Sequence, residues 1–447
     1  MLINILIGET TTSPETSQQF SPTSPFAIFI YALVLFLLIG LIAVLIIIRE
    51  YKNTNTVLIR EKKTKKSLDV FAEGSGGGSG TNAQKNRNVE RFSELTLLDK
   101  SLEKAEAVQY DYVTNLKEFS ESFRNYCATK KNLYYTIQDI RAFISNLATS
   151  KIMILQGMSG TGKTSIALAF EDFIGNQTTV IAVQPMWKER SDLVGYFNEF
   201  TKKFNETPLL KELYRANFDD QIYIIVLDEV NIARIEYYFA EFLSLLEYPN
   251  IEQRTLEITN DSWAKDPKLL TDGRLKIKPN VYFLGTANND ESTFSISDKV
   301  YDRAMILNLD KKAEAFVGEE ASRVRISNDN FEKLIKEAKD DYKNYDALDE
   351  KIDRLNKIIN DHFQINFGNR MVNQLKTYIP VYIACGGNED EAFDDFVTRK
   401  ILRKLEGKDA LKINSEITPF IDELNTEFGK EAMPLAKEYV STFIING

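Results

Sequence analysis

The hydrophobic residues of this chain follow three different patterns along its length. The first is an unbroken apolar run over residues 26–48, FAIFIYALVLFLLIGLIAVLIII, which contains no charged side chain. As an α-helix this run would measure roughly 34 Å, enough to cross the hydrocarbon core of a bilayer. A cleaved signal peptide would need a basic leader, a shorter apolar core and a small-residue cleavage site, which this stretch lacks. We therefore predict a single N-terminal transmembrane helix.

The charges on either side of this run predict its orientation. Residues 1–25 contain no Lys or Arg, whereas Arg49 and the cluster REKKTKK follow the run. By the positive-inside rule, 1–25 form an extracytoplasmic tail and the rest of the chain lies in the cytoplasm, as a single-pass protein of the inner membrane. The basic cluster either contacts anionic headgroups or is a solvated flank. With the flexible stretch EGSGGGSGT, natural or introduced, it makes 49–81 a juxtamembrane segment and linker.

The second pattern is a helical spacing of apolar positions, and it occurs on both sides of the central part of the chain. Apolar residues recur every three or four positions from Val89 to Leu102, which is typical of a helix with one buried face. With two further helices expected before residue 150, we predict a helical pre-domain over 82–149. Charged helical patterns also dominate after residue 327, and we predict a helical lid and C-terminal region over 328–447.

The third pattern is a series of short apolar runs within 150–312. Several are continuous, as in parallel strands that are buried on both faces of a sheet. Two apolar–charged alternations, 256–258 and 275–277, predict a β-hairpin. We therefore predict an α/β fold in which a parallel sheet is flanked by helices. The runs that predict its strands lie at 152–155, 179–184, 222–227, 281–290 and 305–309.

The segment GMSGTGKT at 157–164 stands between the first of these strands and a helix. Strand, glycine-rich loop, lysine, hydroxyl and helix in this order are the P-loop pattern. The glycines let backbone N–H groups face phosphate oxygens, Lys163 places its charge against the β- and γ-phosphates, and Thr164 offers Mg²⁺ a hydroxyl ligand. The nucleotide-binding residues expected here are Gly157, Ser159, Gly160, Thr161, Gly162, Lys163, Thr164 and Ser165.

Two carboxylates follow the apolar run at 222–227. We expect this strand beside the P-loop strand, so that Asp228 at its end can hold Mg²⁺ through water. Glu229 is placed to orient or deprotonate the attacking water. An apolar run that ends in Asp-Glu is weak evidence by itself, but its position after a P-loop makes these residues strong candidates for the metal carboxylate and the water activator.

Four further residues are candidates for contacts with the nucleotide. The amide of Asn288 can hydrogen-bond a γ-phosphate or the attacking water. Arg303, just before the last strand, can cross a subunit boundary as an arginine finger. Arg370, near the start of a lid helix, can fold over the nucleotide, unless it is an ordinary surface arginine of that helix. Arg234 either reaches a neighbouring subunit or forms a surface ion pair.

Composition narrows the chemistry of the site. The formal net charge is −10, which argues against a protein devoted to wrapping nucleic acid. His362 is the only histidine, so zinc sites and His-based triads have almost no ligands or bases available. Cys127 and Cys385 lie far apart without metal-ligand spacing, which predicts two buried thiols rather than a disulfide.

The motifs GMSGTGKT, IIVLDE, GTANND, YDRA and FGNR occur in the order found in AAA+ ATPases, and the chain resembles this family over 119–405. DLVGY and LDEVN with the helix that follows are similar to the McrB-related branch, the motor NTPases of modification-dependent restriction systems. The resemblance implies a homo-oligomeric ring, usually of six subunits. It also implies these roles: Mg²⁺ carboxylate for Asp228, catalytic glutamate for Glu229, sensor 1 for Asn288, trans-acting finger for Arg303 and sensor 2 for Arg370.

The sequence departs from the restriction-type members of that branch at two motifs. DEVNIAR stands where they read DEINRAN, and GTANNDEST stands where they read GTMNTADRS. The GTP preference of those members is therefore not carried over to this chain. We expect ATP, with GTP left open, together with Mg²⁺.

Three functions are consistent with these features. The first is a membrane-anchored NTPase that hydrolyses nucleotide in a ring to remodel or activate a partner, in bacterial anti-phage defence. The second is a DNA-translocating motor of a McrBC-like system with a separate nuclease, although the sequence gives no support for DNA binding. The third is a nucleotide-switched assembly module with little turnover. The protein partner, a nuclease or another effector, is not identified by the sequence.

Overall fold

The computed structural model describes residues 89–288, 293–309 and 313–444. The chain divides into two units, Met1–Asn82 and Ala83–Gly447. All described residues belong to the second unit. The predicted extracytoplasmic tail, transmembrane helix and linker, 1–81, therefore lie outside the described residues.

Within the described ranges, the structure contains no helix that is both long enough and apolar enough to span a bilayer. The 19-residue helices α13 (Tyr345–Phe363) and α16 (Ala410–Phe428) have nearly the length but carry charged side chains, which are costly to bury in hydrocarbon. This finding contradicts the predicted localisation as a single-pass protein of the inner membrane, and we do not retain it. The run 26–48, on which that prediction rested, lies outside the described residues.

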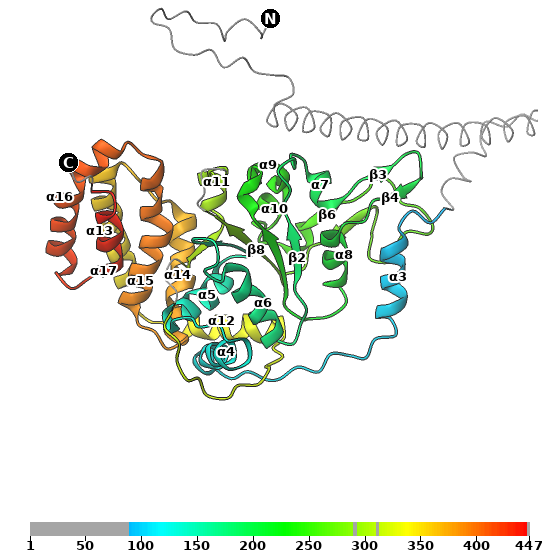
Figure 1. Cartoon of the computed structure of the whole chain (residues 1–447), viewed down its shortest axis with the longest axis horizontal. Coiled ribbons are helices and arrows are strands. Elements are labelled where there is room, and N and C mark those ends of the chain that lie inside the picture. Colours follow the sequence, from blue (N-terminus) through cyan, green and yellow to red (C-terminus); the bar gives the residue numbers. More distant parts are fainter. Residues whose placement is uncertain (1–88, 289–292, 310–312, 445–447) are drawn as a thin grey trace, which may run out of the picture. The chain divides into compact units, whose positions relative to one another are not determined.

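A five-stranded parallel sheet forms the centre of the described unit (Figure 1). Its strand order is β2-β5-β8-β1-β9, so the first strand of the domain lies inside the sheet. Leu155 of β1 lies opposite Thr286 of β8 on one side and Leu307 of β9 on the other. The predicted parallel sheet is confirmed, with strands β1 (Ile152–Gln156), β2 (Thr179–Ala182), β5 (Tyr223–Asp228), β8 (Val281–Ala287) and β9 (Met305–Asn308).

Alternate residues of the strands face two different hydrophobic clusters, because successive side chains of a strand point to opposite faces. Met153 and Leu155 belong to a cluster shared with α4, α5 and α6. Ile152 and Ile154 belong to a cluster shared with α8, α9 and α10. Both faces are thus covered, which explains the continuous apolar strands. The helices are α4 (Leu116–Lys131), α5 (Ile137–Thr149), α6 (Lys163–Phe173), α8 (Pro208–Arg215), α9 (Ile235–Tyr238) and α10 (Ala240–Leu245).

The helices expected over 82–149 are divided between the two faces of the sheet. α4 and α5 pack with α6 through a group of buried aromatic rings that includes Phe123, Phe143 and Phe170. α3 (Ser93–Leu102) instead packs against α8, and its Leu95 belongs to the cluster on the opposite face. These helices are therefore part of the sheet domain rather than a separate body.

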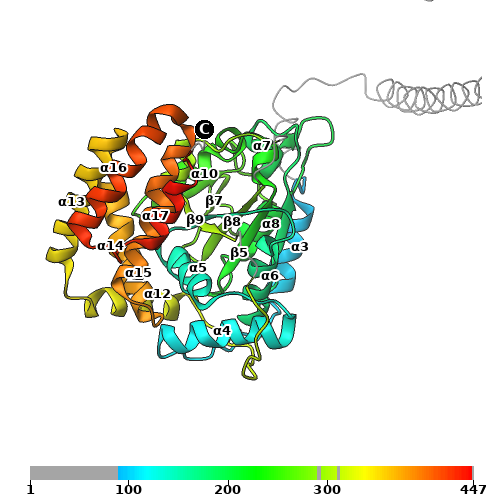
Figure 2. The same ribbon diagram turned by 60° about the vertical axis from the view of Figure 1, so that its left-hand side comes forward.

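A helical region follows the sheet domain in the chain, as predicted, and lies beside it (Figure 2). Its α14 packs against α5, and its η3, a π-helical segment, packs against β9. The lid thus contacts both the helices and the edge of the sheet. Its elements are α12 (Asn328–Asp341), α13, α14 (Asn369–Ala384), α15 (Glu389–Phe396), η3 (Val397–Ile401), η4 (Leu402–Gly407), α16 and α17 (Pro434–Ser441).

Two short antiparallel hairpins complete the sheet domain. β6 (Thr255–Glu257) pairs with β7 (Arg274–Lys276), which confirms the predicted hairpin with its strands shifted by one residue. β3 (Phe197–Asn198) pairs with β4 (Lys203–Phe204), and the sequence did not predict this hairpin. The remaining short elements are α7 (Arg190–Val194), η1 (Val230–Ile232), η2 (Ile251–Gln253) and α11 (Asp298–Tyr301).

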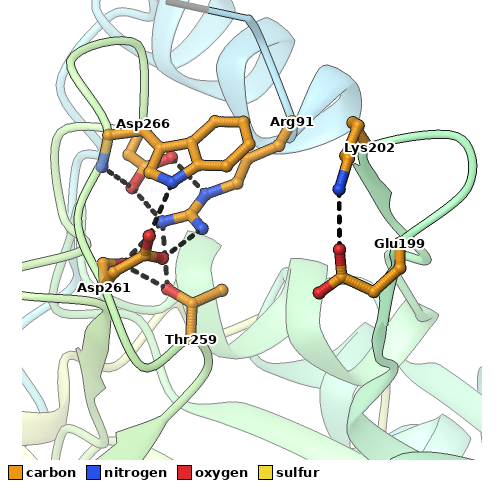
Figure 3. Close-up of polar contacts among 7 residues, drawn as sticks. Arg91, Glu199, Lys202, Thr259, Asp261 and Asp266 are labelled. Carbon is orange, nitrogen blue, oxygen red and sulfur yellow. Dashed lines mark hydrogen bonds and ion pairs between the residues drawn. The ribbon is translucent and has the colours of Figure 1, made fainter. Parts of the chain in front are cut away.

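Arg91, just before α3, connects these two hairpins (Figure 3). Its guanidinium forms ion pairs with Asp261 at 2.7 Å and Asp266 at 2.6 Å, in the segment between β6 and β7, and stacks 4.5 Å from the ring of Trp263. Its backbone carbonyl accepts a hydrogen bond from the amide of Phe204 in β4 at 2.8 Å. Arg91 is 2% exposed, so the start of the described chain is fixed to both hairpins.

Candidate functional site

Residues 157–162 form the turn between β1 and α6, and two of its glycines are required by the backbone geometry. Gly157 has a φ of +144°, and a Cβ atom there would lie 2.6 Å from the carbonyl oxygen of Leu309. Gly162, the N-cap of α6, has a φ of +92°. The turn places the N-terminus of α6 at the carboxyl end of β1, where backbone N–H groups and the helix dipole favour an anion.

Lys163 is the first residue of α6, and only 7% of it is exposed. Its ammonium donates hydrogen bonds to the carbonyl oxygens of Gly157 at 2.8 Å and Met158 at 2.7 Å. The amine is therefore held inside the curve of its own loop. Phosphate oxygens that enter this curve can replace the two carbonyls as acceptors, because they carry full negative charge.

Asp228 and Thr164 meet at the end of β5. The hydroxyl of Thr164 donates to Oδ1 of Asp228 at 3.1 Å. A carboxylate and a hydroxyl are hard oxygen ligands that suit Mg²⁺, which keeps several waters and phosphate oxygens in its octahedral shell. This pair fits a magnesium ion, although no group of three or more His, Cys, Asp or Glu side chains that could hold a metal occurs among the described residues.

Thr286 of β8 connects the carboxylate of Asp228 to the backbone of Glu229. Its hydroxyl donates to Oδ1 of Asp228 at 2.7 Å and accepts from the backbone amide of Glu229 at 2.9 Å. We expected the Asp228 strand beside the P-loop strand, but β8 lies between them. For this reason Thr286 was not among the predicted site residues. The one feature of the sequence that marks it is its position as a polar residue near the end of the otherwise apolar strand VYFLGTA.

Glu229 stands in an unusual backbone conformation next to Asn288. Its φ is +57° and its ψ is +52°, the left-handed region, which costs a non-glycine residue about 1 kcal/mol. This conformation turns the chain immediately after β5. The amide nitrogen of Asn288 lies 3.4 Å from Oε1 of Glu229, the length of a weak hydrogen bond. The two side chains are thus close enough to share one water molecule or one phosphate oxygen.

A cavity of about 410 Å³ joins these residues. Part of its wall comes from 132–135, before α5, where the hydroxyl of Tyr135 donates to the carbonyl of Gly162 at 3.0 Å. Gly157, the first residue of the loop, was predicted to bind nucleotide but does not line the cavity. The predicted residues that line the cavity are Ser159, Gly160, Thr161, Gly162, Lys163, Thr164, Ser165, Asp228, Glu229 and Asn288.

The predicted arginines lie elsewhere. Arg303 and Arg370 do not line this cavity, and they form ion pairs with one carboxylate, Glu247, at 3.2 and 2.7 Å. Arg234 is half exposed, lies 3.8 Å from Glu236 and stacks 4.8 Å from the ring of Phe294. The structure thus brings the P-loop, the two acidic residues and Asn288 together, and places Arg303 and Arg370 with each other.

The lid reaches the P-loop strand through a residue that the sequence analysis missed. Arg403 hydrogen-bonds the side chain of Gln156, the last residue of β1, and its guanidinium lies 3.5 Å from the centre of the Tyr301 ring. Nearby, Lys400 donates to the carbonyls of Tyr301 and Ala304, and burial lowers its pKa to about 7. The charged residues of this helical stretch follow the pattern of an ordinary exposed helix face. The sequence therefore did not indicate that Lys400 and Arg403 contact the sheet domain.

Two family models match different parts of the chain. Residues 152–304 match the family model for the AAA domain of the dynein-related subfamily. This segment is an AAA domain of the ATPase class. A nucleotide, usually with Mg²⁺, is what such AAA domains bind. The match gives no support to the finer resemblance to the McrB-related branch. Residues 320–443 match a second model, described as a domain of unknown function (DUF8727).

The solved structures that are similar to this chain include two proteins at low identity. A predicted ATPase from Cytophaga hutchinsonii is 14% identical, with a TM-score of 0.44, and the alignment covers 74% of this chain and 97% of that one. A full-length MCM homolog from Methanopyrus kandleri is 11% identical, with a TM-score of 0.39 and coverages of 73% and 62%. Both TM-scores lie below 0.5, so neither structure carries an argument about this chain, and the AAA assignment of residues 152–304 rests on the family match. A search of curated proteins gave no match.

Proposed function

We propose that the AAA domain hydrolyses a nucleoside triphosphate, with ATP as the expected substrate. The observation that carries this proposal is the meeting of Thr164, Asp228, Thr286 and Glu229 within hydrogen-bond distance at the mouth of the P-loop. These residues come from three elements that are distant in sequence. A structural cluster would not need a glutamate held exposed in the left-handed region beside a loop that favours anions.

Each residue of the site has a role in hydrolysis. Thr164 and Asp228 would hold Mg²⁺, which neutralises the charge that develops on the phosphates. Lys163 would bind the β- and γ-phosphates, and the backbone N–H groups at the start of α6 would donate hydrogen bonds to the same phosphates. Glu229 orients the attacking water and accepts its proton, while Asn288 fixes the water or the γ-phosphate. The reaction therefore depends on positioning and charge stabilisation.

We further propose that the chain works as a homo-oligomeric ring. Arg303 precedes β9 and the P-loop follows β1, and these strands are parallel neighbours, so the two features lie at opposite ends of the strands. An arginine at that end serves the nucleotide of a neighbouring subunit better than its own. Hydrolysis would then depend on subunit contact, and the ring would use it to remodel or activate a protein partner.

The test is phosphate release by the full chain with Mg²⁺ and either ATP or GTP. Glu229→Gln should lower the rate by at least about a hundredfold while nucleotide binding persists, because the amide accepts no proton. Glu252→Gln is the matched control, since it removes the charge of an exposed carboxylate that pairs with Lys276 at 2.6 Å. The proposal fails if neither nucleotide is hydrolysed by the unaltered chain, or if Glu229→Gln is as active as that chain.

A further inference from the structure

Six consecutive residues of the lid, 399–404 with the sequence RKILRK, pack against the sheet domain. They include the end of η3 and the start of η4, and they lie within the part of the chain that matches the domain of unknown function. Each of the four cationic side chains is at most 19% exposed and bonds to a group of the sheet domain. Lysine and arginine are rarely so buried unless they are paired, so this segment is a docking contact of the lid.

Three of the four cations hold the chain on either side of β9. Lys400 donates to two carbonyl oxygens between the end of α11 and the start of β9, and Lys404 forms an ion pair at 3.0 Å with Asp302 in the same connection. Arg399 donates at 3.1 Å to the carbonyl oxygen of Asn308, the last residue of β9. These three contacts fix the lid to the edge strand of the sheet.

The fourth cation, Arg403, reaches one strand further, to the end of β1. Its Nη1 donates to Oε1 of Gln156, and the amide nitrogen of the same glutamine donates at 3.1 Å to the hydroxyl of Tyr301. The guanidinium lies 3.5 Å from the centre of that tyrosine ring, and its Nη2 donates to Glu406 at 3.1 Å. Gln156 is 5% exposed. Both ends of its side chain are therefore held, one of them by the lid.

Gln156 directly precedes the P-loop, so its position determines where the loop begins. Its backbone carbonyl accepts from the amide of Leu309 at 2.8 Å. The carbonyl of the next residue, Gly157, accepts from the ammonium of Lys163 at 2.8 Å. Gly157 also lies against the carbonyl of Leu309 so closely that a Cβ atom does not fit. With so little room at its first residue, the loop follows any displacement at the end of β1.

The lid acts on the loop from outside the nucleotide cavity. Every residue that the structure places in the wall of this cavity comes before residue 289 of the chain, so none of them belongs to the lid. Arg403 therefore has its effect through Gln156 and not through a phosphate. A loop that is already fixed when the nucleotide arrives loses less conformational freedom on binding, and this saving appears as higher affinity.

We infer that Arg403 is a positioning residue that fixes the P-loop for the triphosphate, and that the lid controls nucleotide affinity through this contact. The inference rests on the proposed function, because it takes the P-loop as the nucleotide site. When residues 399–404 are docked on the sheet domain, the end of β1 is held and the loop is ordered. When the lid moves away, Gln156 loses its partner and the affinity falls. This assigns a task to one segment of the domain of unknown function.

The experiment measures the Kd of the full chain for adenylyl imidodiphosphate, an ATP analogue with an unreactive terminal bridge, in the presence of Mg²⁺. Arg403→Met keeps the apolar stem and removes the donors, and it should raise Kd at least about fivefold. In phosphate release with ATP, KM should rise by a similar factor while kcat stays within about twofold, because the groups around Asp228 and Glu229 are untouched. A general loss of structure would lower kcat as well.

Lys404→Met is the matched control for Arg403→Met. It removes the neighbouring cation and its ion pair with Asp302 but leaves the contact with Gln156, so Kd should change by less than about twofold. Thermal unfolding shows whether the two variants lose similar stability. The inference is overturned if Arg403→Met binds the analogue within about twofold of the unaltered chain, or if Lys404→Met weakens binding as much as Arg403→Met does.

A double variant tests whether Arg403 acts through Gln156. Gln156→Leu removes the other partner and should raise Kd to a similar extent, and adding Arg403→Met should then raise it by less than about twofold more. Fold-changes that multiply in the double variant would overturn the inference. A chain that binds the analogue but hydrolyses neither ATP nor GTP refutes the proposed hydrolysis, whereas the Kd values still decide the role of Arg403. A chain that does not bind the analogue refutes both.

Discussion

The hydroxyl of Thr286 offers the sharpest test of how the site is built, because this residue binds no nucleotide in the proposed mechanism. Thr286→Val keeps the shape of the side chain and removes the hydroxyl. Thr286 is 2% exposed, so the methyl group of valine fills the same space and water does not replace the lost group. The change therefore removes the donor to Asp228 and the acceptor for the amide of Glu229, at 2.7 and 2.9 Å, without opening a cavity.

The magnitude follows from these two hydrogen bonds. A hydrogen bond to a charged group contributes about 1.5–3 kcal/mol, and an amide left without its partner costs about 1–3 kcal/mol. If about 2.7 kcal/mol of this total is lost from the positioning of Asp228 and Glu229, kcat falls about a hundredfold. The P-loop contacts of Lys163 and the start of α6 are untouched, so KM should change by less than about threefold.

Steady-state phosphate release against nucleotide concentration separates these two effects. Thr286→Ser is the control, because it keeps the hydroxyl and loses one methyl group, and it should retain most of kcat. Thermal unfolding checks that the fold survives in both variants. The reasoning is refuted if Thr286→Val keeps kcat within about twofold of the unaltered chain, or if Thr286→Ser loses as much activity as Thr286→Val.

Two further predictions concern stability. Burial lowers the pKa of His362, but its hydrogen bonds with Glu416 and Glu423, both 2.8 Å, outweigh this effect and raise the pKa above its ordinary value. The stabilisation is therefore complete below about pH 6.5 and is lost as the pH rises through the folded-state pKa. The free energy of unfolding, measured with denaturant, should be higher at about pH 5.5 than at about pH 8.5, and His362→Gln should remove this contribution. An equal difference between the two pH values in the variant would count against this explanation. Arg91→Met should lower the free energy of unfolding by about 3 kcal/mol, because the buried carboxylate of Asp266 loses its cationic partner and keeps only the amide of Trp263. A loss below about 1 kcal/mol in chemical denaturation would contradict this account.

The sequence was most informative where function depends on a short continuous segment. The P-loop could be located because glycines, lysine and hydroxyl must follow one another on a single turn between a strand and a helix. The central strands could be located because both faces of a covered parallel sheet are apolar, which leaves unbroken runs such as IYIIVL. The hairpin of β6 and β7 was predicted for a related reason, since its alternating residues have one buried side and one exposed side.

The failures have an equally specific cause. Thr286 and Arg403 carry no local signal, because their roles come from strand order and from the packing of the lid. The expected place of the Asp228 strand was wrong by one strand for the same reason, since parallel strands that are joined by helices can follow several orders in a sheet. The inner-membrane localisation was inferred from hydropathy and flanking charge, and the described structure contradicts it.

The sequence by itself determined the parallel sheet with flanking helices and the helical region that follows it, and it predicts the loop that would bind phosphate and the residues that would hold a metal and activate water. These properties depend on residues that are close in the chain. Only the tertiary structure decided that Thr286 joins the carboxylate of Asp228 to the backbone amide of Glu229, and that Arg403 is the lid residue at the P-loop strand. It also decided that Arg303 and Arg370 share Glu247 at the opposite end of the strands. Such contacts depend on which strand lies beside which and on where a helix begins over the sheet, and these are results of packing the whole core at once.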